Sequence, residues 1–286
     1  MRKPKIGVAL GAGGARGLAQ IIILEALDEM KIKPAVISGS SIGAIVGAFL
    51  AAGFSMEQLR EIVDEIILGK RSKFWEIHKK SDFMKYFDFI DPTIRSGGLL
   101  KGNKLINFLT KKLKVSDFND LQIPLKVVTT NYYSKKEEVL TDGKLMPAIR
   151  ASYALPFLFA PIKINKHFLF DGGMVNPLPY DVLRGSCDIV LAIDVSATNP
   201  QREENTSPSS YEVLFSAFQI MQNSIVNEKL KLNKPDIHIK TNIKDVRVHE
   251  FLKTDEIYRQ AEPSKKELQE KLEIVLSNFT KSKPSS

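Results

Sequence analysis

The sequence predicts an α/β fold in which parallel strands alternate with helices. Residues 6–10 form an apolar run, and a glycine-rich turn separates them from apolar residues at helical spacing over 18–30. Residues 35–38 and 42–52 repeat this order of short apolar run, turn and helix. Two consecutive strand–turn–helix units favour a parallel sheet with helices packed on its faces.

The later elements continue this alternation less regularly. We expect further helices at 55–68, 105–113, 146–154 and 211–230, and further strands at 125–130, 138–141, 162–164, 168–170, 187–195 and 236–240. Asn165-Lys166 joins two of these strands as a hairpin, whereas the polar segment 196–210 predicts a long loop. Ser264 and Glu267 form a capping box that predicts the start of the last helix.

The composition is that of a folded protein. Of the 286 residues, 43% are hydrophobic and 26% are charged, which allows a sizeable core and excludes a disordered or collagen-like chain. The single cysteine, Cys187, can form neither an internal disulfide nor a cysteine-rich zinc site. We therefore expect a reducing, cytoplasmic setting.

Positive charge is concentrated in residues 70–114. This segment carries 12 Lys or Arg against four Asp or Glu, an excess equal to the net charge of +8 for the whole chain. It also carries the only tryptophan, Trp75, among several Phe and Tyr residues. Such a surface could contact an anionic membrane peripherally, and the alternative is a solvated face whose aromatic side chains point inward. No nucleic-acid motif is present, so we expect no nucleic-acid partner.

Residues 34–56 contain no charged side chain, and their length alone would allow a membrane-spanning helix. Pro34 at the start and Gly39-Ser40-Ser41 inside the segment favour a short strand, a tight turn and a buried helix instead. The N-terminus resembles a signal peptide only faintly, because Arg16 and Glu25 interrupt its apolar stretch. We therefore expect neither a membrane span nor a signal peptide.

Gly39-Ser40-Ser41-Ile42-Gly43 fits the G-x-S-x-G pattern of a nucleophile elbow, and it lies between a predicted strand and a predicted helix. Glycines two positions on either side of Ser41 allow a sharp turn from which the hydroxyl projects. The following helix directs its N-terminal amides towards the serine, which favours an anion there. A turn whose hydroxyl only caps the helix would share this pattern, so the neighbouring motifs must decide.

A second glycine-rich turn, Gly11-Ala12-Gly13-Gly14-Ala15-Arg16-Gly17, follows the first predicted strand. Its glycines let backbone N–H groups converge on an oxyanion or a phosphate. Dinucleotide binding predicts an acid at the end of the second strand, and a P-loop predicts Gly-Lys-Ser/Thr, but the sequence has neither. Consecutive parallel strands end at the same edge of a sheet, so this turn can supply oxyanion donors beside Ser41.

A carboxylate is the best candidate for the base that activates Ser41. Asp171 ends a predicted strand and is followed by Gly172 and Gly173, and it could accept the serine proton directly in a two-residue dyad. The four histidines lack surroundings typical of a triad: His78, His167, His238 and His249. Asp194 is the alternative carboxylate, for which we favour a structural role as the cap of the following loop.

The three motifs in this order resemble the patatin-like phospholipase family, which has a glycine-rich oxyanion turn, a G-x-S-x-G elbow and a later D-G-G or D-G-A. Further fragments resemble its bacterial members: Gly98-Leu99-Leu100, Ala151-Ser152-Tyr153-Ala154-Leu155-Pro156 and Asn176-Pro177-Leu178-Pro179. The resemblance covers residues 5–195 well and the rest loosely. It implies a three-layer α/β/α sandwich with a mostly parallel central sheet. It also implies a single domain over 1–286, with a variable basic subregion at 70–114 and a helical C-terminal part at 211–280.

The resemblance further implies a lipid acyl hydrolase of the phospholipase A, lysophospholipase or carboxylesterase type. By position, Ser41 is the expected nucleophile and Asp171 the proton acceptor, without a histidine. The expected oxyanion turn comprises Gly11, Gly13, Gly14 and Arg16, with the amides of Gly13 and Gly14 as donors and Arg16 fixing the turn. The supporting motif residues are Gly17, Gly39, Gly43, Gly172 and Gly173. Ala12, where many relatives have another glycine, is a departure that concerns the flexibility of the turn.

A lipid or acyl ester is the expected partner, and the mechanism implies no metal ion and no cofactor. Two alternatives stay open. The same acyl-enzyme could pass its acyl group to an alcohol or a lysolipid, which would make the protein an acyltransferase. The elbow could also persist as part of the fold in a non-catalytic lipid-binding regulatory module.

Overall fold

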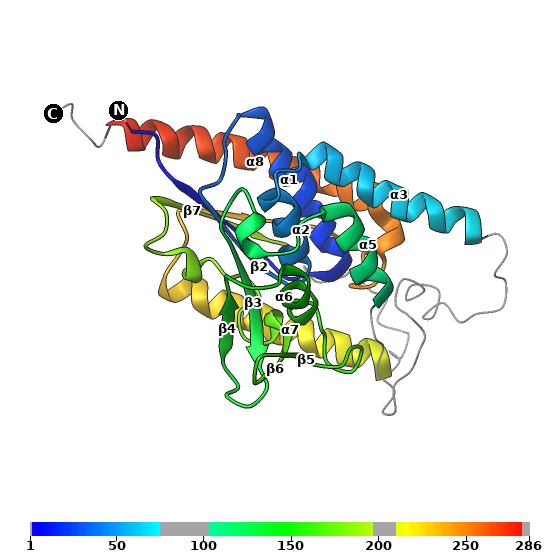
Figure 1. The fold of residues 1–286 in the computed structure, drawn as a ribbon. Coiled ribbons are helices and arrows are strands. Elements are labelled where there is room, and N and C mark those ends of the chain that lie inside the picture. Colours follow the sequence, from blue (N-terminus) through cyan, green and yellow to red (C-terminus); the bar gives the residue numbers. More distant parts are fainter. Residues whose placement is uncertain (1, 75–102, 197–209, 282–286) are drawn as a thin grey trace.

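The computed structural model describes residues 2–74, 103–196 and 210–281, and Figure 1 shows how their elements are arranged. In this part of the chain eight strands form one sheet: β1 (Ile6–Leu10), β2 (Val36–Ser40), β3 (Leu125–Asn131), β4 (Glu137–Leu140), β5 (Ile162–Ile164), β6 (His167–Asp171), β7 (Ile189–Asp194) and β8 (Ile237–Lys240). The helices are α1 (Ala19–Glu29), α2 (Ile42–Ala51), α3 (Met56–Phe74), α5 (Asn103–Leu113), α6 (Leu145–Ser152), α7 (Ser210–Leu232) and α8 (Thr254–Lys281). Short 3-10 helices follow β1 at Gly14–Leu18 and β6 at Gly172–Met174.

Hydrogen-bonded neighbours in the sheet follow the path β5-β6-β3-β2-β1-β7-β8, and β4 also pairs with β3. Strands β1, β2, β3, β7 and β8 are parallel, whereas β4, β5 and β6 pair antiparallel with their neighbours. β1 lies between β2 and β7, and all five of its residues are buried. The predicted α/β class with a mostly parallel sheet is confirmed.

Helices cover both faces of the sheet. Successive residues of β1 point to opposite faces: Val8 and Leu10 belong to a large apolar cluster with residues of α1, α2 and α8, whereas Ala9 packs in a smaller cluster with Val226 of α7. In Figure 1, α1 and α8 accordingly lie on one side of the sheet and α7 on the other. The expected three-layer α/β/α sandwich is confirmed.

Strands β2 and β6 meet end to end on the same side of β3, because β4 occupies its other side. Ser40 at the end of β2 pairs with Val128 of β3. Asp171 at the end of β6 pairs with Thr129, the next residue of β3. The two strands run in opposite directions, so the residues at their ends lie beside each other.

The last helix begins earlier than the capping box predicts. α8 starts at Thr254, so Ser264 lies inside the helix and does not cap it. The helix also continues through Pro263, which lacks the N–H that would bond to the carbonyl four residues earlier. Tertiary packing overrides the signal, because Ile257 and Leu268, on either side of Pro263, are both buried in the main apolar cluster.

The other predicted elements differ from the structure mainly at their ends. The hairpin predicted at Asn165-Lys166 connects β5 to β6, with Asn165 at a φ of 53°. α3 continues past its predicted end to Phe74. Residues 75–102 of the basic segment lie outside the described residues, so the structure does not place the membrane contact expected there.

Within the described residues, no helix combines the length and the apolar character that crossing a membrane requires. The uncharged segment 34–56 contains β2 and α2, as its proline and glycine residues predict.

Replacing Pro263 with alanine is predicted to stabilise the protein. The Pro263 side chain is exposed, so the substitution removes little packing and restores an N–H inside the helix. We expect the free energy of unfolding, measured by urea denaturation, to increase by about 1–3 kcal/mol. Glu262→Ala at the neighbouring exposed position is the control, and it should change this free energy by less than ~0.5 kcal/mol. A Pro263→Ala variant no more stable than the wild type would contradict the argument.

Candidate active site

The sharp strand-to-helix turn predicted from the G-x-S-x-G pattern is present between β2 and α2, and we call it the elbow. Ser41 directly precedes α2 with a φ of 56° and a ψ of −122°, which is unusual for a residue with a side chain. Gly39 and Gly43 permit this turn: a Cβ on Gly39 would lie 2.4 Å from the Gly43 carbonyl oxygen, and one on Gly43 would lie 2.2 Å from the Leu10 carbonyl oxygen. Side chains at these two positions would force the elbow apart.

Ser152, the last residue of α6, fixes the backbone of the elbow. Its hydroxyl accepts a hydrogen bond from the Ser41 amide at 3.0 Å and donates one to the Val128 carbonyl at 2.7 Å. Ser152 is fully buried. The elbow is thereby tied to β3, a role that the sequence did not suggest for this residue.

Asp171, at the end of β6, lies next to Ser41. Its Oδ2 accepts a hydrogen bond from the Ser41 hydroxyl at 2.8 Å, and its Oδ1 accepts one from the Gly173 amide at 2.7 Å. Thr130 of β3 donates its hydroxyl to the Asp171 carbonyl at 2.8 Å, which holds the strand end in place. The structure thus brings the two residues of the predicted dyad within the distance that direct proton transfer requires.

Burial raises the pKa of Asp171 to about 6, from about 4 for an exposed aspartate. Removal from water disfavours the charged carboxylate, and the hydrogen bonds from Gly173 and Ser41 offset only part of this effect. The Asp171 carboxylate is therefore ionised at neutral pH and more basic than an exposed one.

Three amides of the glycine-rich turn are already used within the fold. Gly11, Ala12 and Ala15 donate to the carbonyls of Ile193, Pro177 and Val248 at 3.1, 2.8 and 2.8 Å. Gly11, which the sequence groups with the oxyanion turn, therefore holds the turn against β7 and has no free amide. In the part of the chain that the structure describes, Gly13 and Gly14 donate no backbone hydrogen bond, so their amides remain available for a ligand.

The C-terminal part of the chain braces this turn. Gly14 has a φ of 58° and lies so close to Val248 that a Cβ would be 2.3 Å from the Val248 carbonyl oxygen. Arg16 donates a hydrogen bond from Nη1 to the Val246 carbonyl at 3.2 Å. The Arg16 side chain is buried, which lowers its pKa to about 10, although the negative charge of Asp194 opposes this shift. These contacts agree with the expected role of Arg16 in fixing the turn.

The remaining motif glycines lie where the motifs meet their neighbours. Gly17 is in close contact with Ile42, Gly172 with the Val128 carbonyl and Gly173 with the side chain of Gln222 on α7. These contacts bring the glycine turn, the elbow and the end of β6 into one tightly packed unit.

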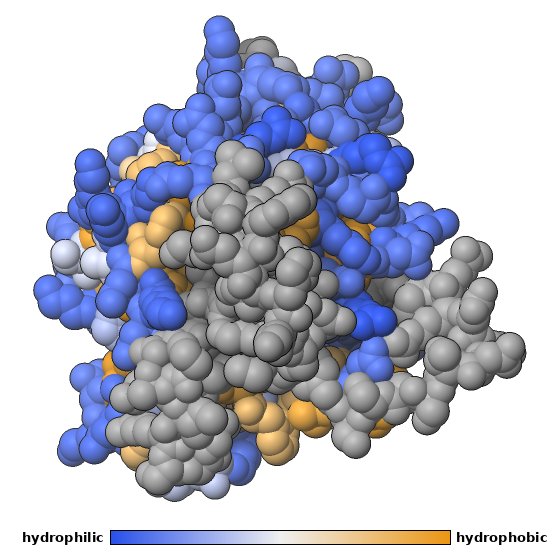
Figure 2. Space-filling view, turned by 90° about the vertical axis from the view of Figure 1, so that its right-hand side faces the viewer, coloured by the Kyte–Doolittle hydropathy of each residue, from blue (hydrophilic) through white to orange (hydrophobic). Residues whose placement is uncertain are grey.

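An apolar cavity of about 250 Å³ lies beside the dyad. Ser41, Asp171, Gly13 and Gly14 contribute to its lining. Most of the remaining lining consists of apolar side chains from α2, α3, α5 and α7, among them Ile45, Phe49, Val63, Phe108, Leu109 and Phe218. On the side of the molecule where α3 and α5 lie in Figure 1, most of the described residues visible in Figure 2 are hydrophilic, and the hydrophobic ones form separate patches. The cavity therefore offers an apolar space next to Ser41 that suits a hydrocarbon chain.

The Ser41 hydroxyl is bonded to a carboxylate and not to an imidazole. His167 bonds to Glu138 at 2.8 Å, His238 lies 3.5 Å from Asp194, and His249 lines the cavity with a pKa lowered by burial. His78 lies outside the described residues.

Asp194, the alternative base, accepts a hydrogen bond from the Ser196 amide at 2.9 Å, so it caps the following loop as expected. Among residues 2–74, 103–196 and 210–281, no group of three or more His, Cys, Asp or Glu side chains is placed to hold a metal ion.

Two parts of the site lie beyond the region in which the sequence resembles the family well. α7 lines the cavity through Phe215, Phe218, Gln219 and Gln222. The segment before α8 lines it through Val248, His249, Phe251 and Leu252. The apolar stripe of α7 predicts a helix but does not indicate what it packs against. Only the fold reveals that these residues reach the dyad.

The fold and the site together define an α/β protein with a serine elbow beside a buried strand-end carboxylate. The crystal structure of VipD from Legionella pneumophila is similar over 94% of this chain and 67% of VipD, with a TM-score of 0.51 and 15% sequence identity. At this identity the similarity shows the fold alone.

The sequence also matches a family. The sequence model of the patatin-like phospholipase family matches residues 8–184, a region that contains all three motifs. The chain belongs to the patatin-like phospholipase family, as its motifs predict.

Several curated proteins are similar in sequence. An uncharacterized NTE family protein of Mycobacterium tuberculosis is 30% identical over 207 residues, covering 72% of this chain and 53% of that protein. Patatin-like phospholipase domain-containing protein 7 of Rattus norvegicus is 35% identical over 195 residues, covering 67% of this chain and 14% of that protein. Lysophospholipase NTE1 of Kluyveromyces lactis is 29% identical over 219 residues, covering 76% of this chain and 14% of that protein. The chain thus spans about half the length of the mycobacterial relative and a smaller part of the other two.

Ser152→Ala is predicted to weaken both the fold and the elbow. The substitution leaves the Ser41 amide and the Val128 carbonyl without their partner, which should cost about 1–3 kcal/mol in the free energy of unfolding. We also expect Ser41 to react ~10-fold more slowly with a fluorophosphonate ester, because its backbone is held less firmly. Ser277→Ala on α8 is the control, and it should change neither quantity. An unchanged labelling rate would show that Ser152 supports the fold but not the elbow.

The raised pKa of Asp171 predicts an acid limit to the reactivity of Ser41. Only the ionised carboxylate accepts a proton, so the rate of fluorophosphonate labelling should fall about tenfold per pH unit below about pH 6. Labelling of the folded protein across this pH range measures the limit. A limit near pH 4 would contradict a raised pKa.

The same raised pKa predicts that the protein becomes less stable as the pH rises, whereas the reactivity of Ser41 increases. The folded pKa lies above the unfolded value, so the folded chain binds the Asp171 proton more tightly. This stabilisation is fully present below the unfolded pKa of about 4 and is lost as the pH rises through 6. Relative to Asp171→Asn, the wild type should lose about 2–3 kcal/mol in the free energy of unfolding between about pH 4 and pH 7. Urea denaturation of both proteins measures this difference, and a constant difference would contradict the prediction.

Proposed function

We propose that the protein is a lipid acyl hydrolase in which Ser41 and Asp171 form a catalytic dyad. The observation that carries this proposal is the 2.8 Å hydrogen bond from the Ser41 hydroxyl to the buried Asp171 carboxylate, beside an apolar cavity. In this arrangement the hydroxyl is the nucleophile, the carboxylate is the base and the cavity holds the acyl chain. Membership of the patatin-like phospholipase family favours a lipid ester as the substrate.

In the first half of the reaction, the Ser41 oxygen attacks the carbonyl carbon of the ester and its proton passes to Asp171 Oδ2. The carbonyl oxygen becomes an oxyanion, which the amides of Gly13 and Gly14 stabilise. The ester C–O bond then breaks, and the protonated Asp171 returns its proton to the departing alcohol. The acyl group remains bonded to Ser41.

In the second half, a water molecule attacks the acyl-enzyme while Asp171 accepts its proton. Collapse of the second oxyanion releases the fatty acid, and Asp171 returns the proton to Ser41. A pKa of about 6 suits this exchange, because the carboxylate is ionised at neutral pH and yet close enough to neutrality to hold the proton in passing. These steps require neither a metal ion nor a cofactor.

The proposed substrates are carboxylic esters of lipids, as in phospholipase A, lysophospholipase or carboxylesterase reactions. The apolar lining of the cavity supports a hydrocarbon chain on the acyl side, and one of the similar sequences is named a lysophospholipase. The proposal also includes a cytoplasmic location and peripheral contact of residues 70–114 with an anionic membrane. These two parts rest on the single cysteine and on the basic, aromatic composition of that segment.

Mass spectrometry of the intact protein after treatment with a fluorophosphonate ester tests the dyad. We expect a single adduct on the wild type, no adduct on Ser41→Ala, and at least ~10³-fold slower labelling of Asp171→Asn. All three proteins should show the same far-ultraviolet circular dichroism. Product analysis with a lysophospholipid then separates hydrolysis, which yields free fatty acid, from transfer of the acyl group to a second lipid.

Asp194→Asn is the matched control, because Asp194 is also buried at the end of a strand. It should label at nearly the rate of the wild type. A folded wild type that takes no label and hydrolyses no lipid ester, with or without vesicles, would support the non-catalytic alternative. If labelling were lost in Asp194→Asn and kept in Asp171→Asn, the assignment of the base would be wrong.

A further inference from the structure

A row of aromatic rings and lysines lies outside the cavity, on the hairpins at the β5 end of the sheet. It consists of Lys163, Phe168, Tyr133, Tyr132 and Lys135, and we call it the aromatic–lysine row. The Lys163 Nζ lies 5.9 Å from the centre of the Phe168 ring, which is 6.2 Å from that of Tyr133. The centres of the Tyr133 and Tyr132 rings are 5.1 Å apart, and the Lys135 Nζ lies 4.0 Å from that of Tyr132. Three rings in succession thus have a cation at each end.

The two tyrosines of the row are largely open to solvent. Tyr132 is 48% exposed and Tyr133 is 68% exposed, although a buried ring would contribute far more to stability. Both lysines of the row are exposed as well, while Phe168 is half-buried. Contiguous exposed rings of this kind are typical of a surface that meets a partner.

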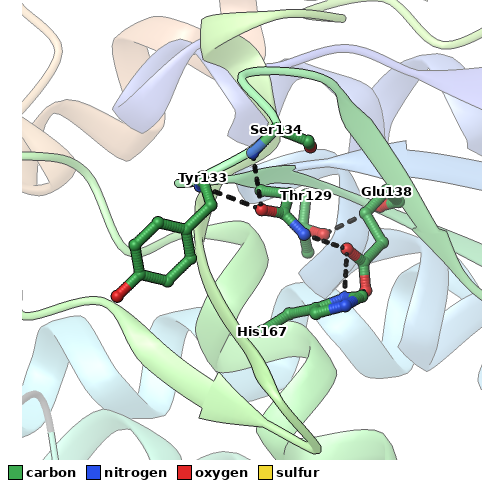
Figure 3. A network of polar contacts seen from close by, with 6 residues as sticks. Thr129, Tyr133, Ser134, Glu138 and His167 are labelled. Carbon is green, nitrogen blue, oxygen red and sulfur yellow. Dashed lines mark hydrogen bonds and ion pairs between the residues drawn. The ribbon is translucent and has the colours of Figure 1, made fainter.

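A polar network holds these tyrosines on a fixed turn (Figure 3). Asn131 accepts hydrogen bonds from the amides of Tyr133 at 3.0 Å and Ser134 at 3.1 Å, and it donates one to Glu138 at 2.8 Å. His167 of β6 bonds to the same Glu138 carboxylate at 2.8 Å. The network therefore joins the β3–β4 hairpin to β6, and the Tyr133 ring points away from it.

The surface around the row is positively charged. The two carboxylates of the β3–β4 hairpin have internal partners, since Glu138 binds Asn131 and His167, and Glu137 accepts from the Asn176 amide. Four exposed lysines surround them: Lys135, Lys136, Lys163 and Lys166. Within the described ranges none of these lysines forms an ion pair, so their charge is available to an anionic partner.

The row follows the strand that pairs with Asp171. Thr129 of β3 pairs with Asp171, and Tyr132 comes directly after the end of β3, so its backbone lies up to about 10 Å from Thr129. The segment 155–159 connects the two regions, because Leu155 and Phe159 line the cavity and the chain then enters β5. Phe157 in this segment is 68% exposed. A surface that covered the row would therefore lie next to the cavity.

We propose that the aromatic–lysine row docks the protein on an anionic lipid surface and so places the dyad beside its substrate. Tyrosine rings, with an apolar body and a polar end, are stable at the depth of lipid headgroups, and lysines are attracted to anionic headgroups. The inference rests on the proposed function, because a lipid acyl hydrolase has to reach esters that are held in a membrane. The row contains no residue of the segment 70–114.

Co-sedimentation with vesicles tests the row without requiring turnover. The full chain is measured against vesicles of equal parts phosphatidylcholine and phosphatidylglycerol, and against pure phosphatidylcholine. Tyr132→Ser with Tyr133→Ser, and separately Lys135→Glu with Lys163→Glu, should each weaken partitioning to the anionic vesicles at least ~10-fold. Both double variants should hydrolyse a water-soluble short-chain ester at the wild-type rate, which also shows that they are folded.

Matched controls lie elsewhere on the molecule. Lys3→Glu with Lys5→Glu makes the same change of charge at the start of β1, and Leu232→Ser with Ile274→Ser removes two other exposed apolar side chains. Both controls should bind vesicles as the wild type does. A loss of binding in the charge control as large as in the lysine variant would show a non-specific effect of net charge and overturn the proposal.

Two further outcomes would also overturn it. Wild-type partitioning by both row variants, with a loss only in Lys79→Glu/Lys80→Glu/Lys85→Glu, would assign docking to the basic segment alone. If the wild type self-associates, and a row variant binds vesicles normally but no longer self-associates, the row would be a protein interface. Failure of the proposed function would be seen separately. If Ser41 is not activated, the wild type and every variant leave the soluble ester intact, and the vesicle-binding results still test the row.

Discussion

Strands β2 and β6 end against neighbouring residues of β3, and both members of the dyad depend on this junction. The Val128 carbonyl accepts a hydrogen bond from the Ser152 hydroxyl, which in turn accepts one from the Ser41 amide. Gly172 packs against the same carbonyl, immediately after Asp171. One peptide group of β3 is thus the common reference for the elbow, for α6 and for the end of β6. A change in the register of β3 would separate Ser41 from Asp171 even if both strands kept their own geometry.

The site contains several locally unfavourable features that the surrounding fold has to offset. Ser41 has a positive φ, Asp171 is ionised at neutral pH although it is buried, and Arg16 is charged in an almost fully buried position. The large apolar cluster on one face of the sheet and the smaller one on the other supply the compensating stability. Features of this kind are concentrated where a protein binds or reacts, and here they occur together around one cavity.

The sequence predicts the α/β class and most elements, because short apolar runs, glycine turns and helical periodicity are local signals. It predicts the elbow for the same reason, since Gly39 and Gly43 act through contacts close to Ser41. It does not predict Ser152, because only the fold places that hydroxyl against the Ser41 amide. Gly11 was grouped with the oxyanion turn because a sequence cannot show that its amide is already bonded to Ile193. The start of α8 was predicted too late because Ser264 and Glu267 fit a capping box, a local signal that tertiary packing overrides.

The spread of the site along the chain has a consequence for its synthesis. Asp171 follows Ser41 by 130 residues, and Val248, which braces the glycine turn, comes later still. Ribosomes add about 5–20 residues per second, so roughly 6–26 seconds pass between the two members of the pair. During that interval the growing chain contains Ser41 without its carboxylate partner. Any membrane near the ribosome is therefore exposed to the complete pair only after Asp171 has been added.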